Sequence, residues 1–174
     1  MKAFRGYDGK VRIFRMDNHM KRFLRSCQRL SFPWFETDQL AELIRKLVKV
    51  DQKFIPNKPG GCLYLRPTAI SNSNFLGVRK SDSVKIFVIM SPVQKYFAGD
   101  IHLGVCDFYE RGGPNSCNSY KLGANYAPTI EISEKFAKEG LSQALWLNNG
   151  NILESGATNI FFLIENPSGC NINN

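Results

Sequence analysis

The spacing of apolar residues predicts two amphipathic helices in the first third of the chain. Between positions 18 and 30 they fall three or four residues apart, which places them on one helical face, formed by Met20, Phe23, Leu24, Cys27 and Leu30. The same spacing predicts a second helix that ends near Asp51, with Thr37 or Asp38 placed to cap its first turn. The apolar face of this helix consists of Leu40, Leu43, Ile44, Leu47 and Val48.

Shorter apolar runs predict strands on either side of these helices. Residues 10–14 alternate between polar and apolar, which is the period of a half-buried strand. The runs at 62–67 and 84–89 also indicate strands, and the second is apolar enough for a central position in a sheet. Residues 70–74 lie between these runs and are mostly polar, so we expect a loop there.

Beyond residue 110 the pattern changes. Residues 111–119 concentrate glycine, proline, asparagine and serine, which favours an interdomain linker. Residues 166–174 carry no pattern and are expected to fray. The elements expected between them are a helix at 127–139 ended by Gly140, a strand at 143–147, a turn at Asn149-Gly150 that needs positive φ, and strands at 152–154 and 158–164.

These elements together predict an α/β protein of two parts. We place an α+β domain at residues 1–108, an interdomain linker at 109–119 and a second domain at 120–174.

The chain is basic, with 23 Lys and Arg against 15 Asp and Glu and a net charge of +8. Such a balance suits anionic small molecules such as phosphates and carboxylates, and it also suits nucleic acid. The cations are scattered, and no zinc-finger spacing of Cys and His is present, so we expect no nucleic acid partner. An unrelated basic binding module stays open as an alternative. No apolar run approaches the length of a membrane span, and no secretory signal begins the chain.

Cysteine and histidine usage predicts neither a disulfide framework nor a metal site. His19 and His102 lack partners at ligand spacing, so no metal is expected. The odd number of cysteines, without a Cys-x-x-Cys pair, indicates free thiols in a reducing compartment. These cysteines are Cys27, Cys62, Cys106, Cys117 and Cys170.

Two short segments carry residues suited to cofactor chemistry. Lys121 stands between the linker and a helix start, among small or polar residues that leave room for a flat ring. An amine used for Schiff-base chemistry needs such access to a carbonyl. Glu154 ends a strand before a tight glycine turn, and pyridoxal phosphate needs an acidic partner at its ring nitrogen. Taken alone, each residue would more often be a solvated surface side chain.

These segments resemble the branched-chain amino acid aminotransferases, which are fold-type-IV pyridoxal-phosphate enzymes. The resemblance rests on Tyr120-Lys121-Leu122-Gly123-Ala124-Asn125-Tyr126 and on residues 154–161, while the blocks at 1–6, 18–26 and 63–67 follow the family in the same order. It implies a D-amino-acid-aminotransferase-like fold, with a small α+β domain and a larger pseudobarrel domain. It also implies pyridoxal 5'-phosphate at their interface and a homodimer.

The resemblance implies a role for each matched residue at the cofactor. Lys121 would form the Schiff base and then carry the proton between the substrate's Cα and the cofactor. Glu154 would pair with the pyridine nitrogen, and Tyr126 would hydrogen-bond the phenolic oxygen. Arg22 matches the arginine of the His-x-x-Arg block that holds the phosphate, an anion to which a guanidinium is suited.

On the substrate side the resemblance implies that Tyr64 and Arg66 orient the substrate carboxylate. Ala157 stands where animal relatives often place a threonine, which removes a hydroxyl near the substrate. A second departure is Asn115-Ser116, where family members usually carry a Gly-Gly pair in the linker. We therefore expect the geometry of the linker to differ.

The implied reaction is a two-step, ping-pong transamination. Leucine, isoleucine or valine would give up its amino group, and 2-oxoglutarate would accept it and leave as glutamate. Chorismate-derived lyase or D-amino-acid chemistry uses a similar constellation, but the Tyr-Lys-Leu-Gly-Ala-Asn-Tyr segment argues against both.

Compared with the family, the chain would lack segments at both ends. We therefore expect a truncated form or an internal fragment of a branched-chain aminotransferase. The alternative is a catalytically inactive fragment that binds the cofactor or a full-length subunit. The expected location is intracellular, in the cytoplasm or the mitochondrion.

Overall fold

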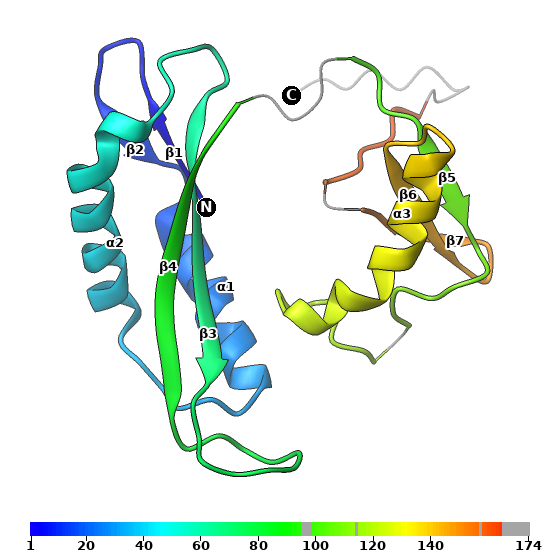
Figure 1. Ribbon diagram of the computed structural model, residues 1–174, viewed down its shortest axis with the longest axis horizontal. Helices are drawn as coiled ribbons and strands as arrows, with labels where there is room; N and C mark the ends of the chain where they lie inside the picture. Colours follow the sequence, from blue (N-terminus) through cyan, green and yellow to red (C-terminus); the bar gives the residue numbers. More distant parts are fainter. Residues whose placement is uncertain (95–98, 114, 157, 165–174) are drawn as a thin grey trace. The chain divides into compact units, whose positions relative to one another are not determined.

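The computed structural model describes residues 1–94, 99–113, 115–156 and 158–164 (Figure 1). The chain divides into two compact units, which are described separately. The first unit consists of residues 1–100 and 116–123, and the second consists of residues 101–115 and 124–174. The domain boundaries expected at residues 108 and 119 stay a prediction.

The first unit contains an antiparallel sheet of four strands in the order β2-β1-β3-β4. The strands are β1 (Lys2–Arg5), β2 (Val11–Ile13), β3 (Cys62–Ser71) and β4 (Val84–Val93). The two long strands pair along their whole length, from Cys62 opposite Val93 to Ser71 opposite Val84. Strand β1 joins this pair to β2, because Ala3 lies opposite both Leu63 and Ile13.

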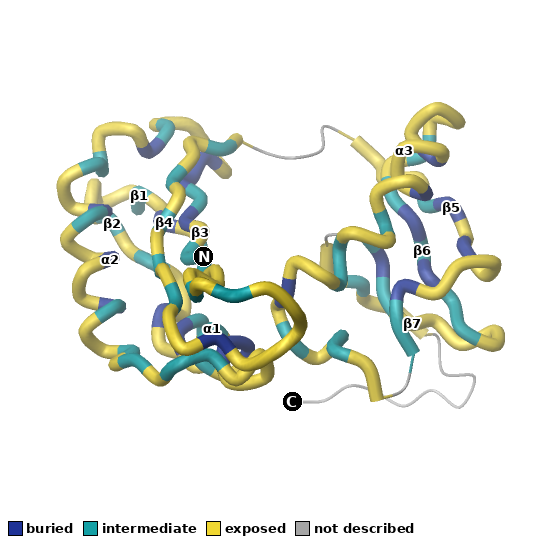
Figure 2. Tube along the Cα trace, turned by 60° about the horizontal axis from the view of Figure 1, so that its bottom comes forward, coloured by how far each residue is buried: buried dark blue, intermediate teal, exposed yellow. Residues whose placement is uncertain are grey.

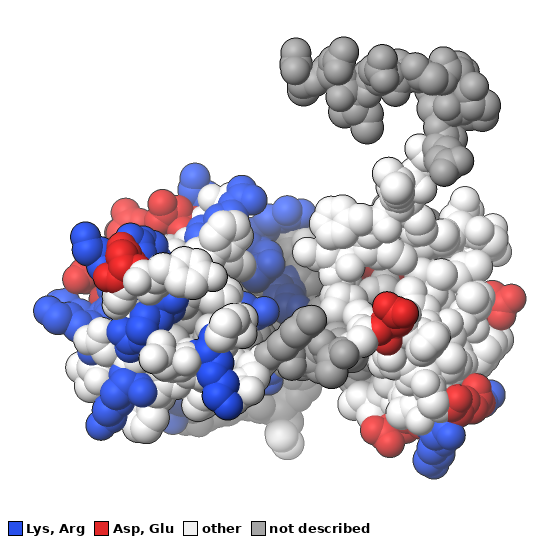
Figure 3. All heavy atoms as spheres, turned by 90° about the horizontal axis from the view of Figure 1, so that it is seen from above, with Lys and Arg blue, Asp and Glu red and all other residues white. Residues whose placement is uncertain are grey.

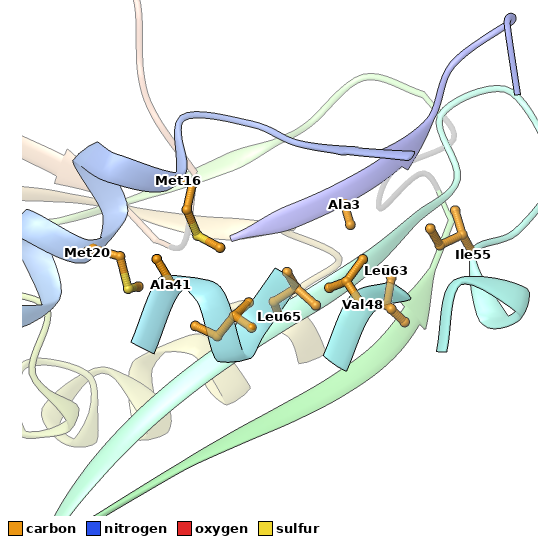
Figure 4. Close-up of a cluster of buried hydrophobic side chains, with 9 residues drawn as sticks. Ala3, Met16, Met20, Ala41, Val48, Ile55, Leu63 and Leu65 are labelled. Carbon is orange, nitrogen blue, oxygen red and sulfur yellow. The ribbon is translucent and has the colours of Figure 1, made fainter. Parts of the chain in front are cut away.

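Two helices cover one face of this sheet, α1 (Met16–Arg29) and α2 (Thr37–Asp51), followed by a short 3-10 helix η1 (Gln52–Phe54). Figure 4 shows how their apolar side chains meet those of the sheet. The buried members are Ala3, Met16, Met20, Ala41, Ile44, Val48, Ile55, Leu63 and Leu65. Both helices predicted from apolar spacing are therefore confirmed. Of their predicted apolar faces, Met20, Ile44 and Val48 are buried in this core, whereas Leu30, beyond the end of α1, and Leu43 are 44% and 61% exposed.

The structure corrects three expectations about the first unit. Strand β4 was expected to be central, but it is an edge strand of the described sheet, and its Ile89 side chain is 51% exposed. The expected loop at 70–74 begins two residues later, because β3 continues to Ser71. Thr37 and Asp38 lie within the first turn of α2, and the capping position is Glu36, which makes no side-chain cap hydrogen bond.

The second unit contains a three-stranded sheet in the order β5-β6-β7. Its strands are β5 (Leu103–Cys106), β6 (Gln143–Asn148) and β7 (Asn151–Ser155). Strand β5 runs parallel to β6, and β7 runs antiparallel to it. The β6–β7 turn has positive φ at Asn149 and Gly150, as the sequence predicts.

Helix α3 (Ile130–Lys138) packs on this second sheet, preceded by the short 3-10 helices η2 (Gly123–Asn125) and η3 (Ala127–Thr129). Figure 2 shows buried positions along β5 and β6. The core consists of Cys106, Ile132, Phe136, Ala144 and Trp146. A Cβ at Gly104 would lie 2.8 Å from the Phe136 ring, so this close approach of β5 to α3 requires glycine.

The structure also corrects the sequence prediction for the second unit. The helix expected at 127–139 is a 3-10 turn followed by α3, and β5 was not predicted. No strand forms over the described residues 158–164, where Phe161 and Leu163 are 87% and 96% exposed. A strand needs a neighbour for its backbone groups, and no described segment pairs with this one. The expected frayed end at 166–174 lies outside the described residues.

Positive charge is concentrated in the first unit. Only three of the 23 Lys and Arg residues belong to the second unit, namely Arg111, Lys135 and Lys138. On the face drawn in Figure 3, blue side chains accordingly gather over the first unit. Within the described residues, no helix combines the length and apolarity that crossing a membrane requires.

Candidate functional site

Helix α1 presents Arg22 beside a neutral histidine. The Arg22 guanidinium Nη2 lies 3.1 Å from Nδ1 of His19, one turn earlier on the helix. Because an arginine only donates, His19 must accept this hydrogen bond. Burial and then neighbouring positive charges, Arg22 and Arg15 among them, lower the pKa of His19 to about 4, which keeps the ring neutral at physiological pH.

The segment that carries Lys121 is anchored on the same helix. The backbone N–H of Lys121 donates to Oγ of the buried Ser26 at 3.0 Å. The ring of Tyr120 lies under the guanidinium carbon of Arg25, 4.9 Å from its centroid, with that of Arg29 at 5.8 Å. These contacts join Tyr120 and the backbone of Lys121 to α1.

The charges of Arg22 and Lys121 act on a common neighbour. Burial first, and then the positive charges of Arg22 and Lys121, lower the pKa of the Met1 amino group to about 6. This amino group donates a hydrogen bond to the carbonyl oxygen of Leu65 at 2.8 Å. Two cations predicted for the cofactor thus converge next to the start of β3, where an anion would be attracted.

Tyr64 and Arg66 lie two residues apart on β3, so they share one face of the sheet. This face is opposite to the one on which Leu63 and Leu65 are buried in the core. The Arg66 guanidinium carbon lies 5.3 Å from the centroid of the Tyr64 ring. The structure therefore brings together the two residues predicted to contact a substrate carboxylate.

In the second unit Glu154 is held by an arginine that the sequence analysis had assigned to the linker. Nη1 of Arg111 lies 2.7 Å from Oε1 of Glu154. The same nitrogen donates to the carbonyl oxygens of Ser155 at 3.0 Å and Gly156 at 3.1 Å. The Arg111 side chain is only 4% exposed, whereas that of Glu154 is 40% exposed.

Arg111 also links Glu154 to Tyr126, because its guanidinium carbon lies 5.1 Å from the centroid of the Tyr126 ring. One buried cation thus contacts both residues predicted for the cofactor ring in this unit. The scarcity of basic residues in this part of the chain could have drawn attention to Arg111, because it is one of three in the second unit. Such a scarce cation is expected to have a specific partner.

Some predicted residues therefore share a neighbour: Arg22 and Lys121 both act on the Met1 amino group, and Tyr126 and Glu154 both contact Arg111. Their predicted roles stay predictions. Ala157 lies outside the described residues. Cys27, Cys62 and Cys106 are buried free thiols, as predicted, and burial raises the pKa of Cys27 to about 11. No cluster of metal-ligating side chains occurs among residues that the structure describes.

Comparison with known families gives a match over most of the chain, to amino-transferase class IV at residues 2–168. The chain is 43% identical over 172 residues to the branched-chain-amino-acid aminotransferase of Dictyostelium discoideum, covering 97% of this chain and 46% of that protein. It is 42% identical to the mitochondrial enzyme of Bos taurus, covering 92% of this chain and 42% of the relative. The chain thus spans about half the length of the curated relatives it matches.

Solved structures of branched-chain amino acid aminotransferases have a similar fold. The Escherichia coli enzyme matches with a TM-score of 0.71 and 21% identity, over 88% of this chain and 50% of that one. The Thermobaculum terrenum enzyme, solved in its PLP-bound holo form, matches with a TM-score of 0.67 and 23% identity, over the same shares of the two chains. At this level of identity the likeness concerns the fold.

Proposed function

Since the chain belongs to the amino-transferase class IV family, we propose that it is part of a branched-chain amino acid aminotransferase that uses pyridoxal 5'-phosphate. The observation that carries the proposal is the anchoring of Lys121 on the helix that presents Arg22. These residues offer an amine and a guanidinium, which suit the aldehyde and the phosphate of this cofactor.

The residues of both units fit the cofactor's chemistry. Among the described residues no carboxylate pairs with Arg22, whose neighbour is the neutral ring of His19. The guanidinium can therefore meet the charge of a phosphate. In the second unit, Glu154 is held by Arg111 and remains 40% exposed, so that an oxygen can reach a ring nitrogen.

We propose the following chemical roles for residues of this chain. Lys121 Nζ binds the cofactor and moves a proton to or from the substrate's Cα. Glu154 holds the proton of the pyridine nitrogen, and Tyr126 donates to the phenolic oxygen. Pyridoxal phosphate supplies the electron sink for the electron pair left at Cα.

On the substrate side we propose that Arg66 binds the carboxylate with a charge-assisted hydrogen bond, supported by Tyr64 beneath its guanidinium. The substrates proposed are leucine, isoleucine or valine, with 2-oxoglutarate as the acceptor and glutamate as its product. We further propose a homodimer, located in the cytoplasm or the mitochondrion. The relatives are named as cytosolic or mitochondrial enzymes.

A second candidate function is a cofactor-binding fragment that does not turn over. It is favoured by the fact that the chain spans only 46% of the length of the Dictyostelium discoideum relative. It is also favoured by the run of exposed apolar side chains Phe161, Phe162, Leu163 and Ile164, which nothing described covers. In this case the chain would bind the cofactor and leave the amino group of leucine in place.

An absorbance experiment tests the proposal and separates the two candidates. The purified chain is mixed with pyridoxal phosphate, then leucine is added, and finally 2-oxoglutarate. We expect a visible band that leucine removes and 2-oxoglutarate restores, and that Lys121→Ala abolishes while Lys138→Ala, on an exposed turn of α3, does not. A band that leucine leaves unchanged would favour the second candidate, and a band unaffected by Lys121→Ala would contradict the assignment of Lys121.

A further inference from the structure

Helix α1 contains a buried serine whose hydroxyl contacts a distant part of the chain. Ser26 is only 4% exposed, and its Oγ accepts the backbone N–H of Lys121 at 3.0 Å. The two residues are 95 positions apart in sequence. A buried hydroxyl in a helix interior is costly unless it is hydrogen-bonded, so this bond accounts for the serine.

The position of Ser26 on the helix relates it to Arg22. The two residues are four apart in α1, so they lie one turn apart on the same helical face, with Cβ atoms about 6 Å from each other. The hydrogen bond from Lys121 thus brings its backbone next to the turn that presents the guanidinium.

Two further contacts hold the same segment in place. Tyr120 is stacked under Arg25, which is the residue immediately before Ser26. Leu122, on the other side of Lys121, is buried, with 7% of its surface exposed. The backbone of Lys121 therefore has a fixed point between two flanking anchors, and its side chain starts from a defined place relative to Arg22.

We propose that Ser26 is a positioning residue, which holds the backbone of Lys121 at a fixed distance from Arg22. The inference rests on the proposed function, because it assigns both residues to one cofactor. In pyridoxal phosphate the aldehyde and the phosphate-bearing methylene stand on neighbouring ring carbons. The amine and the guanidinium must therefore keep a matching separation for both ends to be held at once.

The first experiment measures amide hydrogen exchange in the cofactor-free chain. We expect Ser26→Ala to speed exchange of the Lys121 amide by about three- to tenfold, which corresponds to the loss of the net free energy of one neutral hydrogen bond. The amide of Leu65, bonded to the carbonyl of Met1 just before β1, serves as a reference outside the Lys121 segment. Ser133→Ala is the matched control, because the Ser133 hydroxyl donates a local hydrogen bond to the carbonyl of Thr129, the residue before α3. Equal changes at Lys121 and Leu65 would overturn the anchoring role.

The second experiment compares pyridoxal phosphate with pyridoxal, which lacks the phosphate. Each is mixed with the chain, fixed with borohydride at intervals, and the rate of labelling at Lys121 is measured by peptide mass. The wild type is expected to prefer the phosphorylated form, and Arg22→Ala to lose the preference. Ser26→Ala should reduce the preference by about three- to tenfold, while the double variant should lose no more than Arg22→Ala alone.

The two experiments distinguish failure of the inference from failure of the proposed function. If the wild type labels Lys121 with a preference that Ser26→Ala retains, Ser26 does not position the amine. If the wild type is not labelled at Lys121 at all, the proposed function is contradicted and the cofactor role of Ser26 falls with it. A merely structural role for Ser26 would lower stability and leave the preference unchanged.

Discussion

The ion pair between Arg111 and Glu154 allows a sharp prediction, because its two partners are buried to very different degrees. The Arg111 side chain is 4% exposed and Glu154 is 40% exposed, with 2.7 Å between Nη1 and Oε1. Removing the carboxylate with Glu154→Ala leaves a buried cation that contacts two carbonyls, of Ser155 and Gly156, and the ring of Tyr126, but no counter-charge among the described residues. Removing the cation with Arg111→Met leaves a carboxylate that water reaches.

The expected magnitudes follow from this asymmetry. An uncompensated buried charge costs about 3–5 kcal/mol, and partial access of water at Glu154 places Glu154→Ala at the lower end, about 3 kcal/mol. Arg111→Met loses hydrogen bonds to two carbonyls but retains the apolar volume, so we expect about 1–2 kcal/mol. The double variant should resemble Arg111→Met, so the coupling free energy should equal the cost of Glu154→Ala alone, about 3 kcal/mol.

Trp146 supplies the assay. It is 1% exposed in the core of the second unit, and it lies opposite Glu154 in the β6–β7 register. The other tryptophan, Trp34, is 64% exposed in the first unit, so a Trp34→Phe background makes fluorescence report on the second unit alone. Urea unfolding followed at Trp146 then gives the free energy of unfolding for each variant.

The reasoning is refuted if Glu154→Ala is no more destabilising than Arg111→Met, or if the two changes are additive. Glu134→Ala is the matched control, because this carboxylate is exposed on α3. It should change the free energy of unfolding by no more than about 0.5 kcal/mol.

Two other changes test the fold around the site. The pKa of His19 is lowered to about 4, so the unfolded chain takes up a proton near pH 6.5 before the folded chain does; stability is therefore full above pH 6.5 and falls as the pH drops toward 4. His19→Gln should make the urea midpoint less dependent on pH across that window, and an unchanged pH profile would contradict the lowered pKa of His19. Gly104→Ala places a Cβ 2.8 Å from the Phe136 ring, so the free energy of unfolding followed at Trp146 should fall by about 1–3 kcal/mol. Adding Phe136→Leu should recover part of the loss, and a loss equally large with the smaller side chain would show that the clash is not its cause.

The elements that the sequence predicts well are those whose signal is local. Helices α1 and α2 follow from apolar residues three and four apart, and the turn at Gly150 follows from its dipeptide. Strand β5 has four residues and pairs with β6, about forty residues later, so no local pattern marks it. The apolar run at 84–89 is typical of a strand that is buried on both faces and has a neighbour on each side. In the described sheet β4 has a neighbour on one side only, so the central position predicted for it is wrong.

The residues of the candidate site also differ in whether a local sequence pattern identifies them. Lys121, Tyr126 and Glu154 belong to short segments that resemble a known family, so sequence alone nominates them. Arg111 and Ser26 contact partners that are 44 and 95 residues away in the sequence, and these contacts appear only in the folded chain. Only the folded chain shows that Arg111 holds Glu154.

The most direct test of the central claim is the identity of the lysine that captures pyridoxal phosphate. The chain is mixed with the cofactor, reduced with borohydride, digested, and its labelled peptides are identified by mass. The account predicts a label concentrated at Lys121 and retained in Lys135→Ala, whose amine contacts the ring of Phe108 in the second unit. A label spread over the exposed lysines, with Lys121 no more reactive than Lys135, would contradict it.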